Sequence, residues 1–299
     1  AAPGAASAPA PAADEPGAIA PLPALPPLGF VPLKVVGGEG DGPGQFKAPR
    51  GVAVDKRGRV LVADAGNHRV QVLDGEGAFQ REITGGSKPF ADPVQVAVTS
   101  AGEVLVLDAE TGLLSRFSAD LAFVGEINVA SLGLVKARGL FVAADDTLIL
   151  ADASGRKFVA ASLSGDVRAT VTAPAKGSFG ELSAVARNGA GSYFVGDGQQ
   201  GVIRVLNADG TTINDISFAR VDASVGVQFA ALPDNGMLAT LPEPHKLIRI
   251  DARGKPTGEF GGFGVDQGQF RLPTGIAISG DTVWVVETGN HRLQKLRIK

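Results

Sequence analysis

The sequence contains no cysteine and only one methionine, one tryptophan and one tyrosine among its 299 residues. Without cysteine the chain can form no disulfide, no thiolate zinc site and no cysteine nucleophile. It also has no apolar run of the roughly 18 residues that a membrane-spanning helix needs. These absences exclude thiol chemistry and a hydrophobic membrane span, and they leave the redox compartment open.

Strong charge of either sign is also absent. The chain has 28 Lys and Arg against 31 Asp and Glu, which gives a formal net charge of −3. A generic nucleic-acid-binding domain is normally far more basic. We therefore expect no nucleic acid partner.

Residues 1–28 are mostly Ala and Pro, and no Lys or Arg precedes Lys34. This composition builds no packed core and favours extended polyproline conformations. Small residues followed by a spacer are typical of the region after a removed export signal. We therefore predict an extended segment over 1–28, a folded domain over 29–299, and an exported protein of the periplasm, outer envelope or extracellular space.

Two interpretations of the segment 1–28 stay open. Its composition is that of a disordered linker. Its stretch "AIAPLPALPPL" is also apolar enough to lie along another protein. In the second case the segment contacts other subunits of an envelope complex, which the protein joins without crossing the membrane.

What the chain has in abundance is glycine, 41 residues, among short runs of Val, Leu and Ile. Short apolar runs between turn residues predict an all-β protein. Several runs end in an acidic residue at spacings of 44, 44, 45 and 90 residues: Asp64, Asp108, Asp152, Asp197 and Glu287. The last gap holds a degenerate unit with Leu241 in the acidic position. Six β units of this length predict a six-bladed propeller with four strands in each blade.

The last unit lacks a fourth strand before Lys299. The sequence "FVPLKVVG" at 30–37 supplies one from the other end of the chain. We expect it to pair with residues 292–298, so that the N-terminal strand closes the ring on the C-terminal blade and leaves no open sheet edge there.

The motifs "VADAGNHRVQVLD" at 62–74 and "VVETGNHRLQKL" at 285–296 resemble NHL repeats. The protein is thus similar to a six-bladed NHL β-propeller over about residues 30–299, strongly in the first and last blades and weakly between them. The resemblance implies a fold that carries binding scaffolds as well as lyases, lactonases and other hydrolases. It also implies that an enzyme of this kind works with a metal at the central channel.

The positions that lead into the innermost strands include no carboxylate and no imidazole; they are Arg50, Val94, Arg138, Leu182, Ser224 and Thr274. A catalytic divalent metal needs at least three O or N ligands that converge on one point. We therefore expect no catalytic residue, no metal and no cofactor. Asp92 and Glu181 lie slightly earlier in their loops, which leaves an inward-turned carboxylate open.

All three histidines, His68, His245 and His291, share one position in the repeat. Equivalent turns of neighbouring blades should lie on the order of 10 Å apart, since each turn is at least one ~4.8 Å strand spacing outside the innermost strand. Zinc would bring histidine nitrogens within ~3 to 3.5 Å of each other. We interpret Asp64, Asn67, His68 and Arg69 as a set of hydrogen bonds that closes the turn, with Asn67 at the position of unusual backbone angles.

Basic pairs occupy four of the six equivalent turns. Together with the two channel arginines they form a predicted partner-binding face, called here the basic turn face: Arg50, His68, Arg69, Arg138, Arg156, Lys157, His245, Lys246, His291 and Arg292. A partner that binds it would present acidic or polar groups. The first functional hypothesis is a non-catalytic docking subunit of an exported multiprotein assembly. The alternative is a metal-dependent lyase or hydrolase with a degenerate ligand set.

Overall fold

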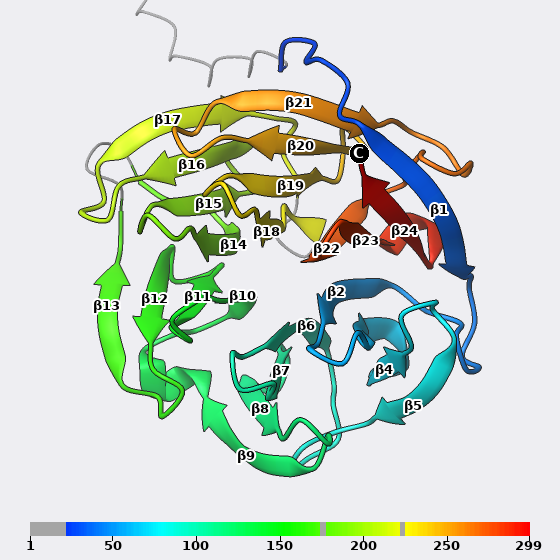
Figure 1. The fold of residues 1–299 in the computed structure, drawn as a ribbon. Helices are drawn as coiled ribbons and strands as arrows, with labels where there is room; N and C mark the ends of the chain where they lie inside the picture. The colour runs from blue at the N-terminus through cyan, green and yellow to red at the C-terminus, as the bar shows by residue number, and fades with distance from the viewer. Residues whose placement is uncertain (1–21, 174–177, 222–224) are drawn as a thin grey trace, which may run out of the picture.

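The computed structural model describes residues 22–173, 178–221 and 225–299. Within these ranges the strands form six four-stranded antiparallel sheets, arranged as blades around a central axis (Figure 1). The predicted all-β, six-bladed propeller is confirmed. The degenerate unit around Leu241 is a complete blade.

Each blade runs outward from an innermost first strand to a rim strand. Blade 1 contains β2 (Pro49–Val54), β3 (Val60–Asp64), β4 (Arg69–Leu73) and β5 (Phe79–Ile83). Blade 2 contains β6 (Pro93–Val98), β7 (Val104–Asp108), β8 (Leu113–Phe117) and β9 (Phe123–Asn128). Blade 3 contains β10 (Ala137–Val142), β11 (Leu148–Asp152), β12 (Lys157–Ala161) and β13 (Val167–Val171).

The second half of the ring follows the same plan. Blade 4 contains β14 (Leu182–Arg187), β15 (Tyr193–Asp197), β16 (Val202–Leu206) and β17 (Thr212–Ser217). Blade 5 contains β18 (Phe229–Ala231), β19 (Met237–Leu241), β20 (Lys246–Ile250) and β21 (Pro256–Gly261). Blade 6 contains β22 (Pro273–Ser279), β23 (Thr282–Glu287), β24 (Arg292–Ile298) and β1 (Phe30–Gly37). Short 3₁₀ helices lie at η1 (Ala65–Asn67), η2 (Val129–Leu132) and η4 (Thr288–Asn290).

Strand β1 closes the ring as the sequence predicts. It runs antiparallel to β24, with Phe30 opposite Ile298 and Gly37 opposite Arg292. In Figure 1 the blue strand lies along the rim beside the red C-terminal strands. Blade 6 therefore combines strands from both ends of the described chain.

Burial follows position in the blade. All five residues of β3 are buried, whereas β13 on the rim is exposed over four of its five residues. A strand that is covered on both faces needs a continuous apolar run, which explains sequences such as "VLVAD". The core consists of apolar layers between neighbouring blades, into which Phe46 and Phe270 are fully buried from the loops that join blades.

The described part of the N-terminal segment, residues 22–28, lies along blade 5 before the chain enters β1. Leu22 and Leu25 pack against the core cluster of blades 4 and 5. The Leu28 N–H donates to the Glu259 carbonyl at 2.7 Å, and the Glu259 N–H donates to the Pro26 carbonyl at 3.0 Å. Residues 1–21 of the predicted extended segment lie outside the described residues. Across the described ranges, no helix has the length and apolar character to cross a bilayer.

Candidate functional site

The acidic residue that ends the second strand of blade 1 anchors a buried hydrogen-bond network. Asp64 is fully buried, and its carboxylate accepts from the Lys47 backbone N–H at 2.7 Å. It also accepts from the Asn67 amide at 2.9 Å, the Arg69 Nε–H at 2.9 Å and the Gln71 amide at 3.0 Å. These four donors connect the interblade loop, the turn and the third strand through one carboxylate.

Blade 6 repeats this network with a longer acid. The buried Glu287 carboxylate accepts from the Arg271 N–H at 3.0 Å and the Asn290 amide at 2.6 Å. The Arg292 Nε–H and the Gln294 amide donate to it at 2.6 and 2.8 Å. A charge-assisted pair with further donors compensates the removal of the carboxylate from water.

Within the described residues, the acidic positions of blades 2, 3 and 4 accept hydrogen bonds from backbone N–H groups only. Asp197 in blade 4 is the sparsest case, since its carboxylate accepts from the Gly180 N–H at 2.6 Å and the Gln200 N–H at 3.0 Å. Burial raises the pKa of the Asp197 carboxyl above its ordinary value, and these two hydrogen bonds oppose the increase only in part.

The residue four positions after each acidic position has a left-handed backbone in all six blades. The φ angles are +56° at His68, +66° at Gly112, +51° at Arg156, +64° at Gly201, +56° at His245 and +53° at His291. The unusual angle thus falls on His68, because Asn67 is the last residue of η1. Gly112 and Gly201 were the sequence signal for this position, since glycine adopts positive φ without steric cost.

Each histidine connects its own blade to the loop before the next blade. His68 Nδ1 lies 2.6 Å from the Ala91 carbonyl oxygen. His245 Nδ1 accepts from the Leu272 N–H at 3.2 Å, and His291 Nδ1 accepts from the Ala48 N–H at 3.1 Å. The imidazoles are interblade ties. Across the described ranges, no three His, Cys, Asp or Glu side chains come together to hold a metal ion.

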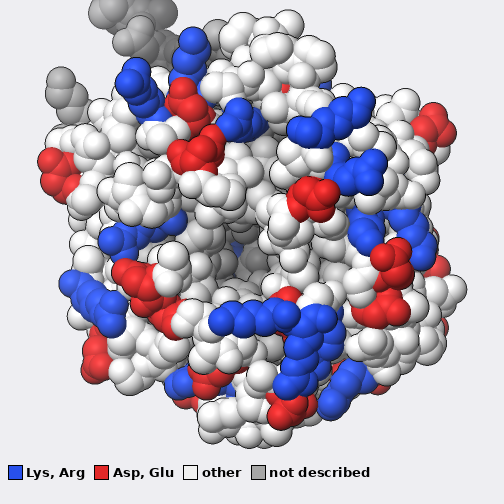
Figure 2. Space-filling model, viewed as in Figure 1, with Lys and Arg blue, Asp and Glu red and all other residues white. Residues whose placement is uncertain are grey.

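The structure also shows how many groups of the basic turn face are engaged in the fold. Arg69 is 8% exposed, and its guanidinium contacts Asp64, Glu82 and two loop carbonyls. Arg292 donates to Glu287 and to the Val265 carbonyl in blade 6, and Lys246 Nζ lies 2.7 Å from Glu259. His68 and Arg156 are exposed, while Lys157, His245 and His291 are half-buried. The turns thus offer a partner less positive charge than their composition indicates. Figure 2 shows one face of the propeller, on which Lys and Arg alternate with Asp and Glu around a central hollow.

A cavity of about 10 Å³ marks a constriction of the central channel. It is lined by Arg50, Val94, Gln95, Arg138, Gly226, Gln228 and Thr274. Arg138 Nη1 lies 3.7 Å from an Asp92 carboxylate oxygen, so that carboxylate faces an arginine. Of the other predicted channel positions, Leu182 is fully buried and Ser224 lies outside the described residues.

A second channel cavity, of about 220 Å³, is lined by β2, β6, β10, β18 and β22 and shares Gln95 and Gln228 with the constriction. Sequence reasoning missed these two glutamines because it chose other positions at the start of each innermost strand. Gln95 is the residue after Val94, and Gln228 directly precedes Phe229, the first residue of β18.

Two interblade loops have the same backbone hydrogen bonds and expose different side chains. In the loop 37–46, the Gly40 N–H donates to the Phe46 carbonyl at 3.1 Å; in the loop 261–270, the Gly264 N–H donates to the Phe270 carbonyl at 3.1 Å. The first loop exposes Glu39 and Asp41. At the same positions the second loop presents Phe263, 68% exposed, and Val265, 66% exposed. We call these two residues the apolar tip.

The apolar tip stands beside the histidine of blade 5. The ring centroids of Phe263 and His245 are 5.0 Å apart. Because His245 Nδ1 accepts a backbone N–H, the neutral imidazole carries its proton on Nε2 as a second donor. Sequence reasoning missed the tip, although an alignment of the two loops would have shown two apolar residues in place of two carboxylates.

Comparison with known proteins places NHL repeats at residues 46–73 and 270–296. Protein lin-41 of Caenorhabditis elegans is 50% identical over 48 residues, which are 16% of this chain and 4% of lin-41. E3 ubiquitin-protein ligase TRIM71 of Rattus norvegicus is 44% identical over 52 residues, 17% of this chain and 6% of that protein. The chain therefore matches a small fraction of either relative's length.

Among solved structures, a streptogramin B lyase superposes with a TM-score of 0.65, covering 90% of this chain and 98% of the lyase. At 12% sequence identity this similarity concerns the fold alone. The blade architecture and the repeat matches agree on the same residues at both ends of the ring. The protein therefore carries NHL repeats in its first and last blades and folds as a six-bladed β-propeller.

Proposed function

We propose that the protein is a non-catalytic, protein-binding scaffold of an exported multiprotein assembly in the periplasm, cell envelope or extracellular space. The observation that carries the binding role is the apolar tip. Phe263 and Val265 are exposed on a loop whose backbone twin exposes Glu39 and Asp41. The fold therefore does not require apolar residues at these positions, and this supports a role for them in recognition.

An exposed aromatic side chain of this kind is suited to a protein interface. Burying a phenylalanine contributes about 1.5–3 kcal/mol, and aromatic residues are enriched at the centres of interfaces. The Nε2–H of His245 adds a donor at the edge of the tip. A partner segment that places an apolar side chain on Phe263 and an oxygen acceptor beside His245 would use both.

The export proposal rests on the composition of residues 1–28. Residues 22–28 of that segment are Pro- and Leu-rich and lie in extended form along β21. The relatives named above match this chain over 48 and 52 residues, which are 4–6% of their own length, so the ligase activity in the name of TRIM71 is not inferred for this chain. What we infer from them is the binding role of the propeller.

Site-specific photocrosslinking in native cells tests the scaffold role. Phe263 is replaced by p-benzoylphenylalanine, and Glu39 is replaced by the same residue as the matched control on the twin loop. We expect a discrete crosslinked protein from position 263 and none from position 39. Equal crosslinking from both positions, or none from either, would contradict the proposal.

Metal analysis addresses the lyase or hydrolase alternative. A scaffold should purify without stoichiometric calcium, zinc or other divalent metal, and its melting temperature should not change with a chelator. A bound metal whose removal lowers the melting temperature would support the enzyme instead.

A further inference from the structure

Neighbouring blades are tied together on the face formed by the turns between first and second strands and between third and fourth strands. Five of the six junctions have a hydrogen bond or ion pair there: Arg57–Asp120, Ser100–Asp146, Arg187–Asp145, Asn188–Asn235 and Lys295–Glu76. They join blade 1 to 2, 2 to 3, 3 to 4, 4 to 5 and 6 to 1. These ties hold the blade edges against each other.

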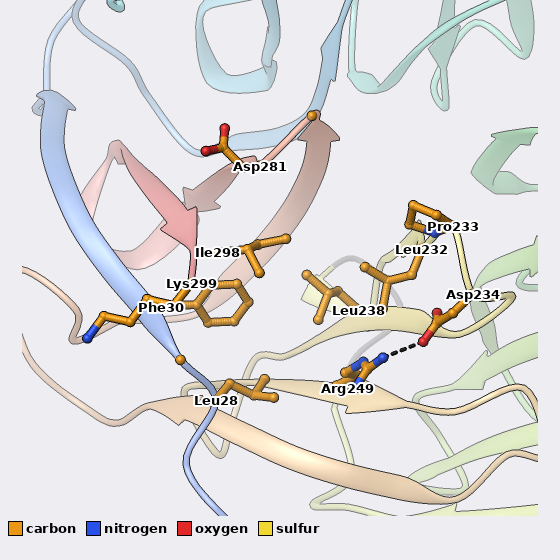
Figure 3. Close-up of a pocket in the computed structure, with 12 residues that line it drawn as sticks. Leu28, Phe30, Leu232, Pro233, Asp234, Leu238, Arg249, Asp281, Ile298 and Lys299 are labelled. Carbon is orange, nitrogen blue, oxygen red and sulfur yellow. Dashed lines mark hydrogen bonds and ion pairs between the residues drawn. The ribbon is translucent and has the colours of Figure 1, made fainter.

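The junction between blades 5 and 6 differs. No hydrogen bond or ion pair between described residues joins these two blades on that face. Asp234 in the first turn of blade 5 pairs with Arg249 of its own blade instead. A pocket of about 720 Å³ opens at this junction (Figure 3).

Apolar side chains from blade 5, from blade 6 and from the segment that precedes β1 line this pocket. Its apolar wall consists of Leu28, Phe30, Leu232, Pro233, Leu238 and Ile298. In Figure 3 these side chains converge from β1, β24 and blade 5 on one space. Phe30 is fixed by an edge-to-face contact with Phe260, at 5.2 Å between ring centroids. The wall is therefore built by packing that the propeller already needs.

The charged residues of the pocket lie at its rim. Arg249 and Asp234 face each other, with 42% and 49% of their side chains exposed. In Figure 3 the ammonium group of Lys299 and the carboxylate of Asp281 point away from the apolar side chains. Two cationic and two anionic side chains thus surround the opening, and their balance selects no charged group.

We propose that this pocket binds a small, uncharged apolar molecule. Its volume falls within the about 300–1,000 Å³ of small-molecule sites, and such sites are mostly apolar with a few polar groups at the edge. A charged ligand would lose its hydration without a free partner of opposite charge. The binding site is separate from the apolar tip, so it would serve a ligand in addition to the protein partner.

The turn between the first and second strands of blade 5 forms one side of the pocket. Strand β18 ends at Ala231 opposite Met237, in register with blade 4, where Arg187 lies opposite Tyr193. Leu232 and Pro233 follow in the turn and line the pocket.

Fluorescence titration of the full chain with N-phenyl-1-naphthylamine, a neutral apolar probe, tests the proposal. We expect saturable binding with a blue-shifted emission. Leu232→Arg, on a half-buried turn residue, should weaken binding at least tenfold. Leu33→Arg is the matched control, because Leu33 is 40% exposed and does not line the pocket.

Circular dichroism melts confirm that both variants fold, and Leu232→Trp fills the pocket without adding charge and should weaken binding as well. Absence of saturable binding, or equal loss in the Leu33 control, would overturn the proposal. Light scattering provides a further test. A concentration-dependent dimer that Leu232→Arg abolishes would show that a second copy occupies the pocket, and would also overturn it.

Discussion

Blades 1 and 5 build the same turn with different chemistry. In blade 1, Asp64 gathers four donors, and Arg69 carries its charge on to Glu82. In blade 5, Leu241 fills the acidic position, and Lys246 replaces the arginine and pairs with Glu259 on the rim.

The backbone of blade 5 is held by other groups. The Thr240 hydroxyl accepts from the Gln228 N–H at 2.9 Å, and His245 keeps the left-handed turn and its tie to Leu272. The comparison teaches that the turn conformation is common to the blades, whereas the buried carboxylate is one of two ways to secure it. Each way should therefore have its own energetic signature.

Asp64→Leu, which gives blade 1 the residue of blade 5, should have the largest effect. It leaves the Arg69 guanidinium buried beside an apolar side chain and removes one of the two acceptors of the Gln71 amide. We expect a loss of about 3–5 kcal/mol in the free energy of unfolding, as for a broken buried ion pair. Urea denaturation measures it.

The double variant Asp64→Leu with Arg69→Lys copies the blade 5 pair completely. It should recover at least about 1 kcal/mol, since lysine can extend its charge towards Glu82 and water. A loss below about 1 kcal/mol for Asp64→Leu alone would show that the carboxylate network is dispensable.

His291→Ala should have the second-largest effect, about 2 kcal/mol by thermal or urea denaturation. It removes the tie to Ala48, worth about 1 kcal/mol, and places a residue that disfavours the left-handed region at φ +53°. His291→Gly loses the tie alone and should cost about half as much. If glycine destabilised the protein more than alanine, the left-handed backbone would not be the reason for residue choice here.

Asp197→Asn in blade 4 should have a smaller effect that depends on pH. The folded-state pKa of Asp197 is raised by burial, so the unfolded state releases its proton first, and stability falls as pH rises between the unfolded and folded pKa values. The asparagine variant lacks this fall, which begins near pH 4 where an unfolded Asp titrates.

At neutral pH the effect of Asp197→Asn should stay below about 1 kcal/mol, since losing one acceptor and removing a buried charge oppose each other. Urea denaturation from pH 4 to 8 provides both numbers. Parallel pH profiles for wild type and variant would refute the raised pKa.

The smallest effect on stability is expected for Phe263→Glu with Val265→Asp, which gives the loop 261–270 the exposed residues of its twin. Because both side chains are exposed, the free energy of unfolding should change by less than about 0.5 kcal/mol. The reciprocal variant, Glu39→Phe with Asp41→Val, is the control for the backbone. A larger loss in either variant would mean that the tip has a structural role.

The number and order of the blades could be predicted from the sequence because they follow from the spacing of the repeated units. The interval between acidic residues gave six blades, and the absent fourth strand after β24 led directly to β1. Other features depend on contacts between distant residues. Arg69 donates to loop carbonyls, and the junction of blades 5 and 6 opens into a pocket. Both features depend on side-chain positions in different segments of the chain, which no local sequence pattern encodes.

The turn residues lie between features that repeat spacing predicts and features that depend on distant contacts. Asn67 is a common turn residue, and composition favoured it for the left-handed position. The structure places that conformation on His68, in register with Gly112 and Gly201. An alignment of the six repeats shows glycine at this position in two of them, and the sequence of a single turn does not show which residue is left-handed.

The antiparallel closure by β1 and β24 has a mechanical consequence. Because Phe30 lies opposite Ile298 at the end of this strand pair, tension applied at residues 29 and 299 would load one backbone pair at a time. The two strands would peel apart as a zipper instead of shearing along their length. Force applied there would strip β1 from the sheet of blade 6 and open the ring before any of the other five blades lost a strand.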